Sequence, residues 1–166
     1  GIANMYMFKK DYKNAVDFYI KAAKKDKNNT TALINASLCY KMLDMTDKSV
    51  EYANKVLAKE NLSADIYYTA SKIDEIKNIQ YLKKAVSLDP MMTDAWLDLA
   101  DIAIKNNRLE LARTYLKPVK YVNSKDHRYY YLAGLIQKQQ GNKEAAQSNF
   151  KKSLEINPFF VEASKE

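Results

Sequence analysis

Bulky, small and polar residues follow the same order in three stretches of the chain. The stretches begin at Thr31, Asp94 and His127, and each opens an apolar pattern of helical period that leads into a second such pattern. Trp96 in the second stretch and Tyr130 in the third hold the same place in this order. Helix pairs that recur at a fixed interval predict a repeat architecture, because one repeat cannot bury its own apolar face and stacking of neighbours closes the core.

On this register the whole chain, residues 1–166, is predicted to be a single array of about five repeats. The repeats cover residues 1–29 (partial), 30–63, 64–92, 93–126 and 127–160, and a further helix begins within 161–166. The third repeat is shortened, because registers read forward from Tyr67 and backward from Pro90 disagree by five residues. We therefore expect a clipped first helix or turn near residues 72–78.

Residues that favour turns separate the predicted helices. Those expected to end first helices are Asp44, Asn106, Asn107 and Gly141. Pro90 and Pro158 follow second helices, where proline blocks continuation of the helix. Pro118 instead falls inside the second helix of the fourth repeat, where the lost backbone hydrogen bond costs about 3 kcal/mol. We predict a kink or an early break of the helix there.

The composition agrees with helices joined by short connections, since the 166 residues include only three glycines and three prolines. The net charge is +7, from 27 basic and 20 acidic residues. A single cysteine, Cys39, excludes an intrachain disulfide, and no segment approaches the roughly 20 apolar residues of a membrane span. The chain opens inside a predicted helix, so we expect a fragment of a longer protein. Its localisation is left open, with a soluble cytoplasmic location preferred.

This pattern resembles the tetratricopeptide repeat family, whose 34-residue helix–turn–helix has large residues at positions 4, 11 and 24 and small ones at 8, 20 and 27. The fourth repeat matches with Trp96, Leu99, Ala100, Ala103, Ala112, Leu116 and Val119, and the fifth with Tyr130, Ala133, Gly134, Ala146, Phe150, Ser153 and Pro158. The resemblance covers nearly the whole chain and implies an all-α, right-handed superhelical solenoid of stacked repeats. Bulky side chains of one helix would fill the space beside small ones of its neighbour.

The resemblance also implies that the first helices line a concave groove. Carried over by register, the groove residues are Ile34, Asn35, Leu38, Lys41, Tyr68, Lys72, Asp94, Leu97, Asp98, Asp101, Ile104, Arg128, Tyr131, Leu135 and Lys138. The apolar members, which the stacking core is not expected to need, are Ile34, Leu38, Leu97, Ile104, Tyr131 and Leu135. Such a stripe suits an amphipathic helix or an extended peptide, or it is covered by another helix of the full-length protein or by a second copy.

Three carboxylates in this groove, Asp94, Asp98 and Asp101, recur at helical spacing. They form an acidic ridge that either recognises a basic segment of a partner or is a solvated helix face. One helix rarely supplies a full oxygen cage, so no metal site is expected.

Chaperone-binding members of the family hold the terminal carboxylate of a peptide with Lys, Asn and Arg side chains. Asn4 and Asn35 occupy the two Asn positions, but Asp65 and Thr69 stand where cationic side chains are required. A carboxylate clamp is therefore not predicted.

No motif in the chain predicts catalysis or a cofactor. His127, the only histidine, lies at a repeat boundary and is expected to be exposed, whereas Cys39 is expected to be a packed, inert thiol. The sequence contains no Gly-rich phosphate loop, no HExxH and no Cys-x-x-Cys. We expect the segment not to be an enzyme.

The basic net charge and the 13 tyrosines are features that nucleic-acid-binding proteins share, so this function is weighed next. The lysines of the first repeat, expected mainly on the outer face of its second helix, are Lys9, Lys10, Lys13, Lys21, Lys24, Lys25 and Lys27. The tyrosines at predicted core positions, which are not free to stack on bases, are Tyr6, Tyr19, Tyr40, Tyr67 and Tyr130. A solvated lysine face is the preferred interpretation.

The predicted function is a protein–protein interaction module, or scaffold, that holds a peptide or a partner helix in the concave groove. Two alternatives stay open. The open terminal repeats could stack on other copies, making the chain an element of homo-oligomeric assembly. The chain could also be the non-catalytic arm of a larger enzyme.

Overall fold

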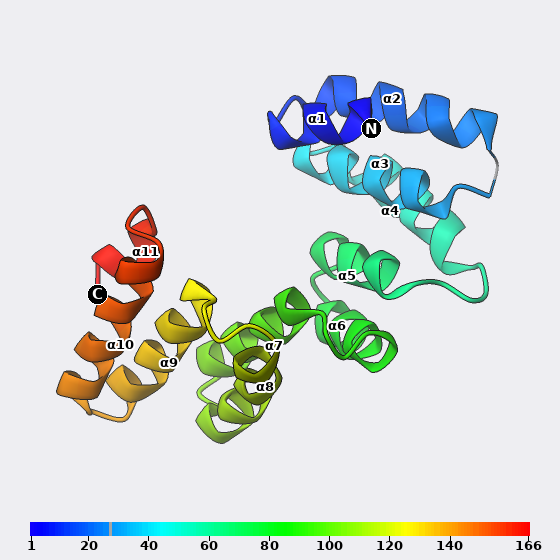
Figure 1. Ribbon diagram of the computed structural model, residues 1–166. Coiled ribbons are helices and arrows are strands. Elements are labelled where there is room, and N and C mark those ends of the chain that lie inside the picture. The colour runs from blue at the N-terminus through cyan, green and yellow to red at the C-terminus, as the bar shows by residue number, and fades with distance from the viewer. Residues whose placement is uncertain (27) are drawn as a thin grey trace. The chain divides into compact units, whose positions relative to one another are not determined.

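The computed structural model describes residues 1–26 and 28–166 of the chain. Lys27, one of the lysines assigned above to the first repeat, lies outside the described residues. The chain forms two compact units, Gly1–Leu88 and Asp89–Glu166. Each unit is built from helix pairs joined by short turns, which Figure 1 shows in the colour order of the chain. They are called the first unit and the second unit below.

The first unit contains three helix pairs. Its helices are α1 (Ile2–Phe8), α2 (Tyr12–Lys25), α3 (Thr30–Met42), α4 (Thr46–Leu57), α5 (Ala64–Ile73) and α6 (Asn78–Leu88). The two helices of each pair pack against each other, and α3 also packs against α2 and α5. The first pair therefore stacks on the second through α2 and α3, whereas the second pair stacks on the third mainly through the first helices α3 and α5.

The second unit contains two helix pairs and a short additional helix. Its helices are α7 (Thr93–Lys105), α8 (Leu109–Val122), α9 (His127–Gln139), α10 (Lys143–Ile156) and α11 (Val161–Ser164). Here α9 packs against α7 and α8, and α11 packs against α10. Residues 1–26 and 28–166 contain no strand, so the predicted all-α class with paired, stacked helices is confirmed. The right-handed superhelical path of the array stays a prediction.

Four of the first helices end in the same kind of turn. The second residue after each helix has positive φ: Lys10 (60°), Asp44 (58°), Asn107 (55°) and Gly141 (80°). The following backbone N–H then donates to the carbonyl five residues earlier, as from Met45 to Tyr40 at 2.9 Å. This bond satisfies a carbonyl that the helix end leaves open. Asn, Asp and above all Gly tolerate the left-handed conformation, which explains their use at three of the four positions.

The connections from second to first helices repeat as well. Asp26, Asp89, Asn123 and Asn157 each begin such a connection, and the Oδ1 of each accepts the backbone N–H two residues on, at distances from 2.9 to 3.2 Å. The backbone N–H three residues on donates to the carbonyl of the same residue. Pro90 and Pro158 lie within two of these turns, directly after the turn-forming side chain. These side chains hold the turn that leads into the next first helix.

Trp96 and Tyr130, which set the register, have equivalent surroundings. Trp96 Nε1 donates to the carbonyl of Pro90 at 2.9 Å, and the Tyr130 hydroxyl donates to the carbonyl of Ser124 at 3.0 Å. In both cases the acceptor lies six residues earlier in the chain, and both aromatic side chains are half-buried. The predicted register is therefore confirmed at the level of single hydrogen bonds.

Bulky and small side chains complement each other between the two helices of a repeat. Ala100 and Leu116 are both buried in the fourth repeat, and Gly134 and Phe150 hold the corresponding positions of the fifth. A Cβ at Gly134 would lie 2.4 Å from Cε1 of Phe150. The larger ring in the fifth repeat thus requires that the small residue opposite it be glycine.

An aromatic pair joins the two helices in each of the first four repeats. The ring centroids are 5.3 Å apart for Tyr6–Phe18, 5.4 Å for Tyr40–Tyr52, 6.3 Å for Tyr67–Tyr81 and 6.0 Å for Trp96–Tyr115. These separations are in the range in which aromatic pairs attract each other. The helix-packing role predicted for Tyr6, Tyr40 and Tyr67 is confirmed.

The third repeat departs from the common pattern on both sides of α5. This helix has 10 residues, whereas α3, α7 and α9 each have 13. It is followed by Asp74 in an extended conformation, and Asp74 Oδ1 accepts the backbone N–H groups of Ile76 (2.9 Å) and Lys77 (3.0 Å). A short Asp-capped turn, residues 74–77, therefore replaces the last turn of a full-length first helix.

The early break predicted at Pro118 is wrong. Helix α8 continues through Pro118 to Val122. Leu116 and Val119, on either side of the proline, are both buried in the core of the second unit. The packing of these two side chains holds the helical path where the backbone hydrogen bond is lost.

Substitution of Gly134 by Ala is expected to lower the free energy of unfolding by up to about 2 kcal/mol. Alanine favours a helix by about 1 kcal/mol over glycine, but the new Cβ meets a buried ring, and overpacking costs about 1–3 kcal/mol. Adding Phe150→Leu, which copies the Ala100–Leu116 pair, should recover at least about 0.5 kcal/mol in a double-mutant cycle measured by urea unfolding. A cycle with no coupling would contradict the proposed complementarity.

Cys39 is expected to resist alkylation in the folded chain. Its side chain is fully buried, and burial raises the pKa of the thiol from 9.0 to about 11. Because the thiolate is the reactive form, iodoacetamide at pH 8 should label the native chain at least about a hundredfold more slowly than the urea-unfolded chain. Comparable labelling rates, followed by mass spectrometry, would show that the thiol is reactive rather than inert.

Candidate functional site

The groove residues of the first unit do not all reach the surface. Ile34 is 1% exposed and packs in a cluster with residues of α4 and α5, including Val56 and Ile66. The prediction that the stacking core does not need Ile34 is therefore wrong. Leu38 packs at the edge of the same cluster and is half-buried, as is Asn35.

Leu97 and Ile104 in the second unit are also core residues, with exposed fractions of 4% and 2%. They belong to one cluster with Leu132 and Ile136 of α9. Their predicted role in the groove is wrong for a physical reason: the side of a first helix that faces the next first helix is used for stacking. Tyr131 and Leu135 pack at the margin of this cluster and remain half-buried.

An ion-pair network ties α9 to α7 in the second unit. Arg128 Nη1 lies 2.6 Å from Asp94 Oδ1, and Arg128 Nη2 lies 2.8 Å from Asp126 Oδ2. The hydrogen bonds with Asp126 and Asp94 raise the pKa of Arg128, against the opposing effect of its partial burial. Burial of Asp126 would raise its pKa, but the hydrogen bonds and charge of Arg128 outweigh burial, and the pKa is lowered. Two of the three groups are predicted groove residues, and both are used to fix the position of α9.

Lysines at equivalent positions make a similar connection in each unit. Lys41 Nζ, on α3, donates to the Ile73 carbonyl at 2.9 Å and to Glu75 Oε1 at 3.0 Å, at the end of α5. Lys138, on α9, forms an ion pair with Glu166, beyond α11. Within each unit, neighbouring first helices are thus linked by a cation of one helix and an acceptor at the next.

The acidic ridge is partly neutralised inside the second unit. Asp94 is paired with Arg128, and Asp101 Oδ2 lies 2.6 Å from Lys105 Nζ on the same helix. Asp98 is half-buried on the same helix. The pKa of the Tyr131 phenol is raised, first by burial and then by the negative charges of Glu166, Asp101 and Glu162. Negative charges from α7 and from residues 161–166 therefore act on this phenol.

Two predicted groove residues of the first unit, Lys72 and Tyr68, contact each other, and Asn4, one of the two Asn positions considered for a carboxylate clamp, contacts a core residue. Lys72 Nζ lies 4.7 Å from the centre of the Tyr68 ring, one turn away on α5. Asn4 Oδ1 accepts the Tyr19 hydroxyl hydrogen bond at 2.6 Å, so this side chain is engaged in packing α1 against α2.

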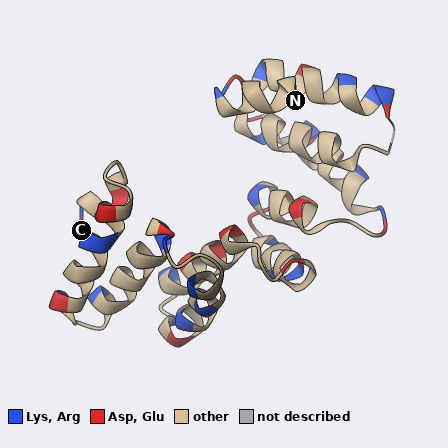
Figure 2. Cartoon of the chain, in the orientation of Figure 1, with Lys and Arg blue, Asp and Glu red and all other residues tan. Residues whose placement is uncertain are grey.

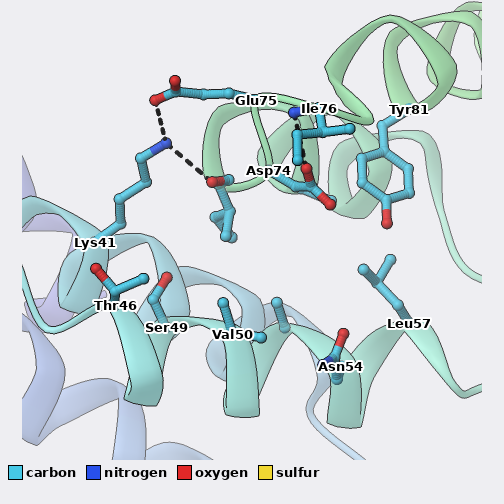
Figure 3. Close-up of a pocket in the computed structure, with 13 residues that line it drawn as sticks. Lys41, Thr46, Ser49, Val50, Asn54, Leu57, Asp74, Glu75, Ile76 and Tyr81 are labelled. Atoms are coloured by element: carbon cyan, nitrogen blue, oxygen red, sulfur yellow. Dashed lines mark hydrogen bonds and ion pairs between the residues drawn. The ribbon is translucent and has the colours of Figure 1, made fainter.

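A cleft of about 550 Å³ lies in the first unit, between α4 and the turn at residues 74–77. Figure 3 shows the side chains of Thr46, Val50 and Asn54 along α4, facing Glu75 and Ile76 in the turn above them. The residues that line it are Lys41, Thr46, Ser49, Val50, Ala53, Asn54, Leu57, Ala70, Ile73, Asp74, Glu75, Ile76 and Tyr81. The cleft lies where the last turn of a full-length α5 is missing.

The lining of this cleft combines a buried apolar base with an exposed apolar rim. Ala53, Ala70 and Ile73 are buried, whereas Val50 is 48% and Ile76 95% exposed. Sequence reasoning identified only Lys41 among the lining residues. The five-residue deficit of the third repeat was the signal for altered geometry here, but a register gives no cavity volume or rim.

The two residues considered as catalytic candidates have structural surroundings. Cys39 is buried, as predicted. The prediction that His127 is exposed is wrong, because only 25% of its side chain is exposed. The edge of one ring meets the face of the other in its contact with Phe160, and the ring centroids are 4.7 Å apart. Among residues 1–26 and 28–166, no group of three or more His, Cys, Asp and Glu side chains is placed to hold a metal ion.

Lysine and arginine residues recur along α2 and α8 (Figure 2). On α2 the lysines Lys13, Lys21, Lys24 and Lys25 are all exposed. Within the described part of the chain, no helix has the length and apolar character needed to cross a membrane.

Two sequence models of the tetratricopeptide repeat match the chain, one over residues 79–136 and the other over residues 1–29 and 127–160. Together these matches cover more than half of the chain. The TPR repeat-containing protein MJ1428 of Methanocaldococcus jannaschii is 32% identical over 164 residues, an alignment that covers 94% of this chain. The chain spans only 28% of the length of that relative.

Solved structures show the same fold. PilW, a type IV pilus biogenesis factor, gives a TM-score of 0.77 at 23% identity, over 93% of this chain and 74% of that one. YrrB, described as a TPR protein with an unusual peptide-binding site, gives 0.68 at 22% identity, over 98% of this chain and 87% of that one. With the repeating turns and the common register, these matches show that the chain belongs to the tetratricopeptide repeat family, whose modules generally mediate protein–protein interactions.

Proposed function

We propose that the chain is a non-catalytic interaction module that binds a basic peptide segment of a partner protein along the first helices of its second unit. The observation that carries this proposal is that Tyr131 is a half-buried aromatic residue at the margin of the core cluster of the second unit, and that the negative charges of Glu166, Asp101 and Glu162 act on its phenol. An aromatic surface surrounded by negative charge suits an extended or helical segment with an apolar side chain beside Lys or Arg.

The local charge balance supports a basic ligand. The three carboxylates that act on the Tyr131 phenol are carried by α7 and the α11 segment. The cations paired with them are Lys105, bound to Asp101, and Lys138, bound to Glu166. These five groups sum to a charge of −1, because two of the three carboxylates are paired with lysines, whereas the chain as a whole has a net charge of +7. Charge complementarity of this kind favours encounter with a cationic segment and disfavours an acidic one.

The second unit also presents this surface on a fixed frame. Arg128 bridges Asp94 and Asp126, and Lys138 bridges to Glu166, so the spacing of the first helices is set by contacts that need no ligand. A pre-organised surface loses less conformational entropy on binding than a mobile one. This is an advantage for a module in which the apolar residues Ile34, Leu97 and Ile104 are buried by stacking and do not contact a ligand.

Two further observations agree with this function. YrrB, which shares the fold, is described as having a peptide-binding site. The non-catalytic part of the proposal is supported by Cys39, which is fully buried and has a pKa of about 11, unlike an activated nucleophile.

The proposal is tested by selecting a random-peptide phage library on the 166-residue chain and measuring the affinity of the enriched peptides by fluorescence anisotropy. Enriched peptides should contain Lys or Arg beside an apolar residue. Replacing Asp101 and Glu162 together by Lys should weaken their binding by at least about tenfold, because attraction becomes like-charge repulsion. The affinity of the unmodified chain should also fall as salt is raised.

The matched control is the double substitution Glu144→Lys/Glu155→Lys on α10. It makes the same change in net charge at two exposed positions of a second helix. The control should leave the affinity within about twofold. Peptides without basic residues, or equal losses in the two variants, would contradict the assignment of this surface.

A further inference from the structure

The cleft of the first unit has an apolar side chain projecting beside it. Ile76 lies in the turn that forms one side of the cleft and is 95% exposed, an unusual degree of exposure for an isoleucine. On the opposite side, Val50 of α4 is 48% exposed. A cleft and an exposed apolar side chain at its edge therefore occur side by side on one surface.

The turn that carries Ile76 is held in place rather than loosely connected. Asp74 Oδ1 accepts the backbone N–H groups of Ile76 and Lys77, at 2.9 and 3.0 Å. On the other side, Glu75 forms an ion pair with Lys41 at 3.0 Å. Because the backbone of the turn is fixed by these bonds, its exposed side chain can enter a partner surface at little cost in conformational entropy.

We propose that the occupant of the cleft is the same turn of a second copy of this chain, with each copy inserting its Ile76 into the cleft of the other. A surface that carries an apolar cleft and an exposed apolar side chain side by side offers each copy both a site to be filled and a group to place in one. Two copies related by a two-fold axis can satisfy both contacts at once, as an isologous interface requires. A different protein would have to supply its own apolar side chain and also cover Ile76.

The charges that flank Ile76 fit the same arrangement. Glu75 precedes it, with 84% of its side chain exposed, and the exposed Lys77 follows it. When two copies of the turn pass each other in opposite directions, Glu75 of each copy comes opposite Lys77 of the other. A two-fold arrangement therefore forms two opposite-charge pairs around the apolar contact, whereas a parallel arrangement would set like charges against each other.

The first test measures self-association of the 166-residue chain by sedimentation velocity over a wide concentration range. We expect a reversible monomer–dimer equilibrium. Ile76→Asp should raise the dimer dissociation constant by at least about tenfold, because it places a charge in the apolar centre of the contact. Ile79→Asp is the matched control, since Ile79 is 41% exposed in the following helix and does not line the cleft. It should change the dissociation constant by less than about twofold.

The second test locates the contact. In a Cys39→Ala background, the Ile76→Cys and Val50→Cys chains are mixed and gently oxidised. A disulfide-linked dimer containing one chain of each kind is expected, because Ile76 of one copy should approach Val50 of the other. Mixing Ile79→Cys with Val50→Cys should give no such product.

Three outcomes would overturn the proposal. They are a chain that stays monomeric at all concentrations, an association that Ile76→Asp leaves unchanged, and a mixed disulfide that forms as well from position 79 as from position 76. Circular dichroism of the variants separates loss of contact from loss of folding. Peptide binding in the second unit does not depend on these results, so either proposal can fail alone.

Discussion

The contact between a bulky side chain and a small one across the two helices of a repeat is the constraint on which the packing of the second unit depends. Ala100 faces the side chain of Leu116, and one repeat later Gly134 makes room for Phe150. The two positions change together between these repeats, because a larger ring opposite needs a smaller residue at the facing position. The same register places the hydrogen bonds of Trp96 and Tyr130, which hold the start of each first helix to the preceding turn.

Stacking also decides which side chains are left for binding. Ile34, Leu97 and Ile104 face the interior of a groove when the register alone is considered, but the neighbouring first helix covers them. The exposed part of the surface consequently contains half-buried aromatic and charged residues instead of an apolar stripe. Since Arg128 and Lys138 are also engaged between repeats, the charges left over around Tyr131 are mainly negative. This shifts the expected ligand from an amphipathic helix with a large apolar face toward a basic segment.

The sequence was sufficient for the helix pairs, their register, the turns at Asp44, Asn107 and Gly141, and the burial of Cys39, because each depends on local residue chemistry or on periodicity. It was not sufficient where the result depends on what a neighbouring element does. Pro118 lies in an unbroken helix because Leu116 and Val119 are buried beside it. His127 is covered because Phe160, which lies beyond the end of α10, reaches its ring. Asp126 could have been identified as a helix cap from its position before His127, but not as the buried partner of Arg128.

The third repeat shows that one repeat can have a different surface while its core residues stay packed against the neighbouring repeat. Ile66, Ala70 and Ile73 remain buried, so the stacking of α5 on α3 and α4 survives the loss of the final helical turn. Val50 of α4 is 48% exposed and lines the cleft beside the turn that follows the shortened helix. An irregular repeat therefore creates a cleft without opening the core, and the Asp74-capped turn that closes the gap also fixes the direction of Ile76. Because stability in such arrays depends mainly on contacts between neighbouring repeats, a surface of this kind can arise at small cost to the fold.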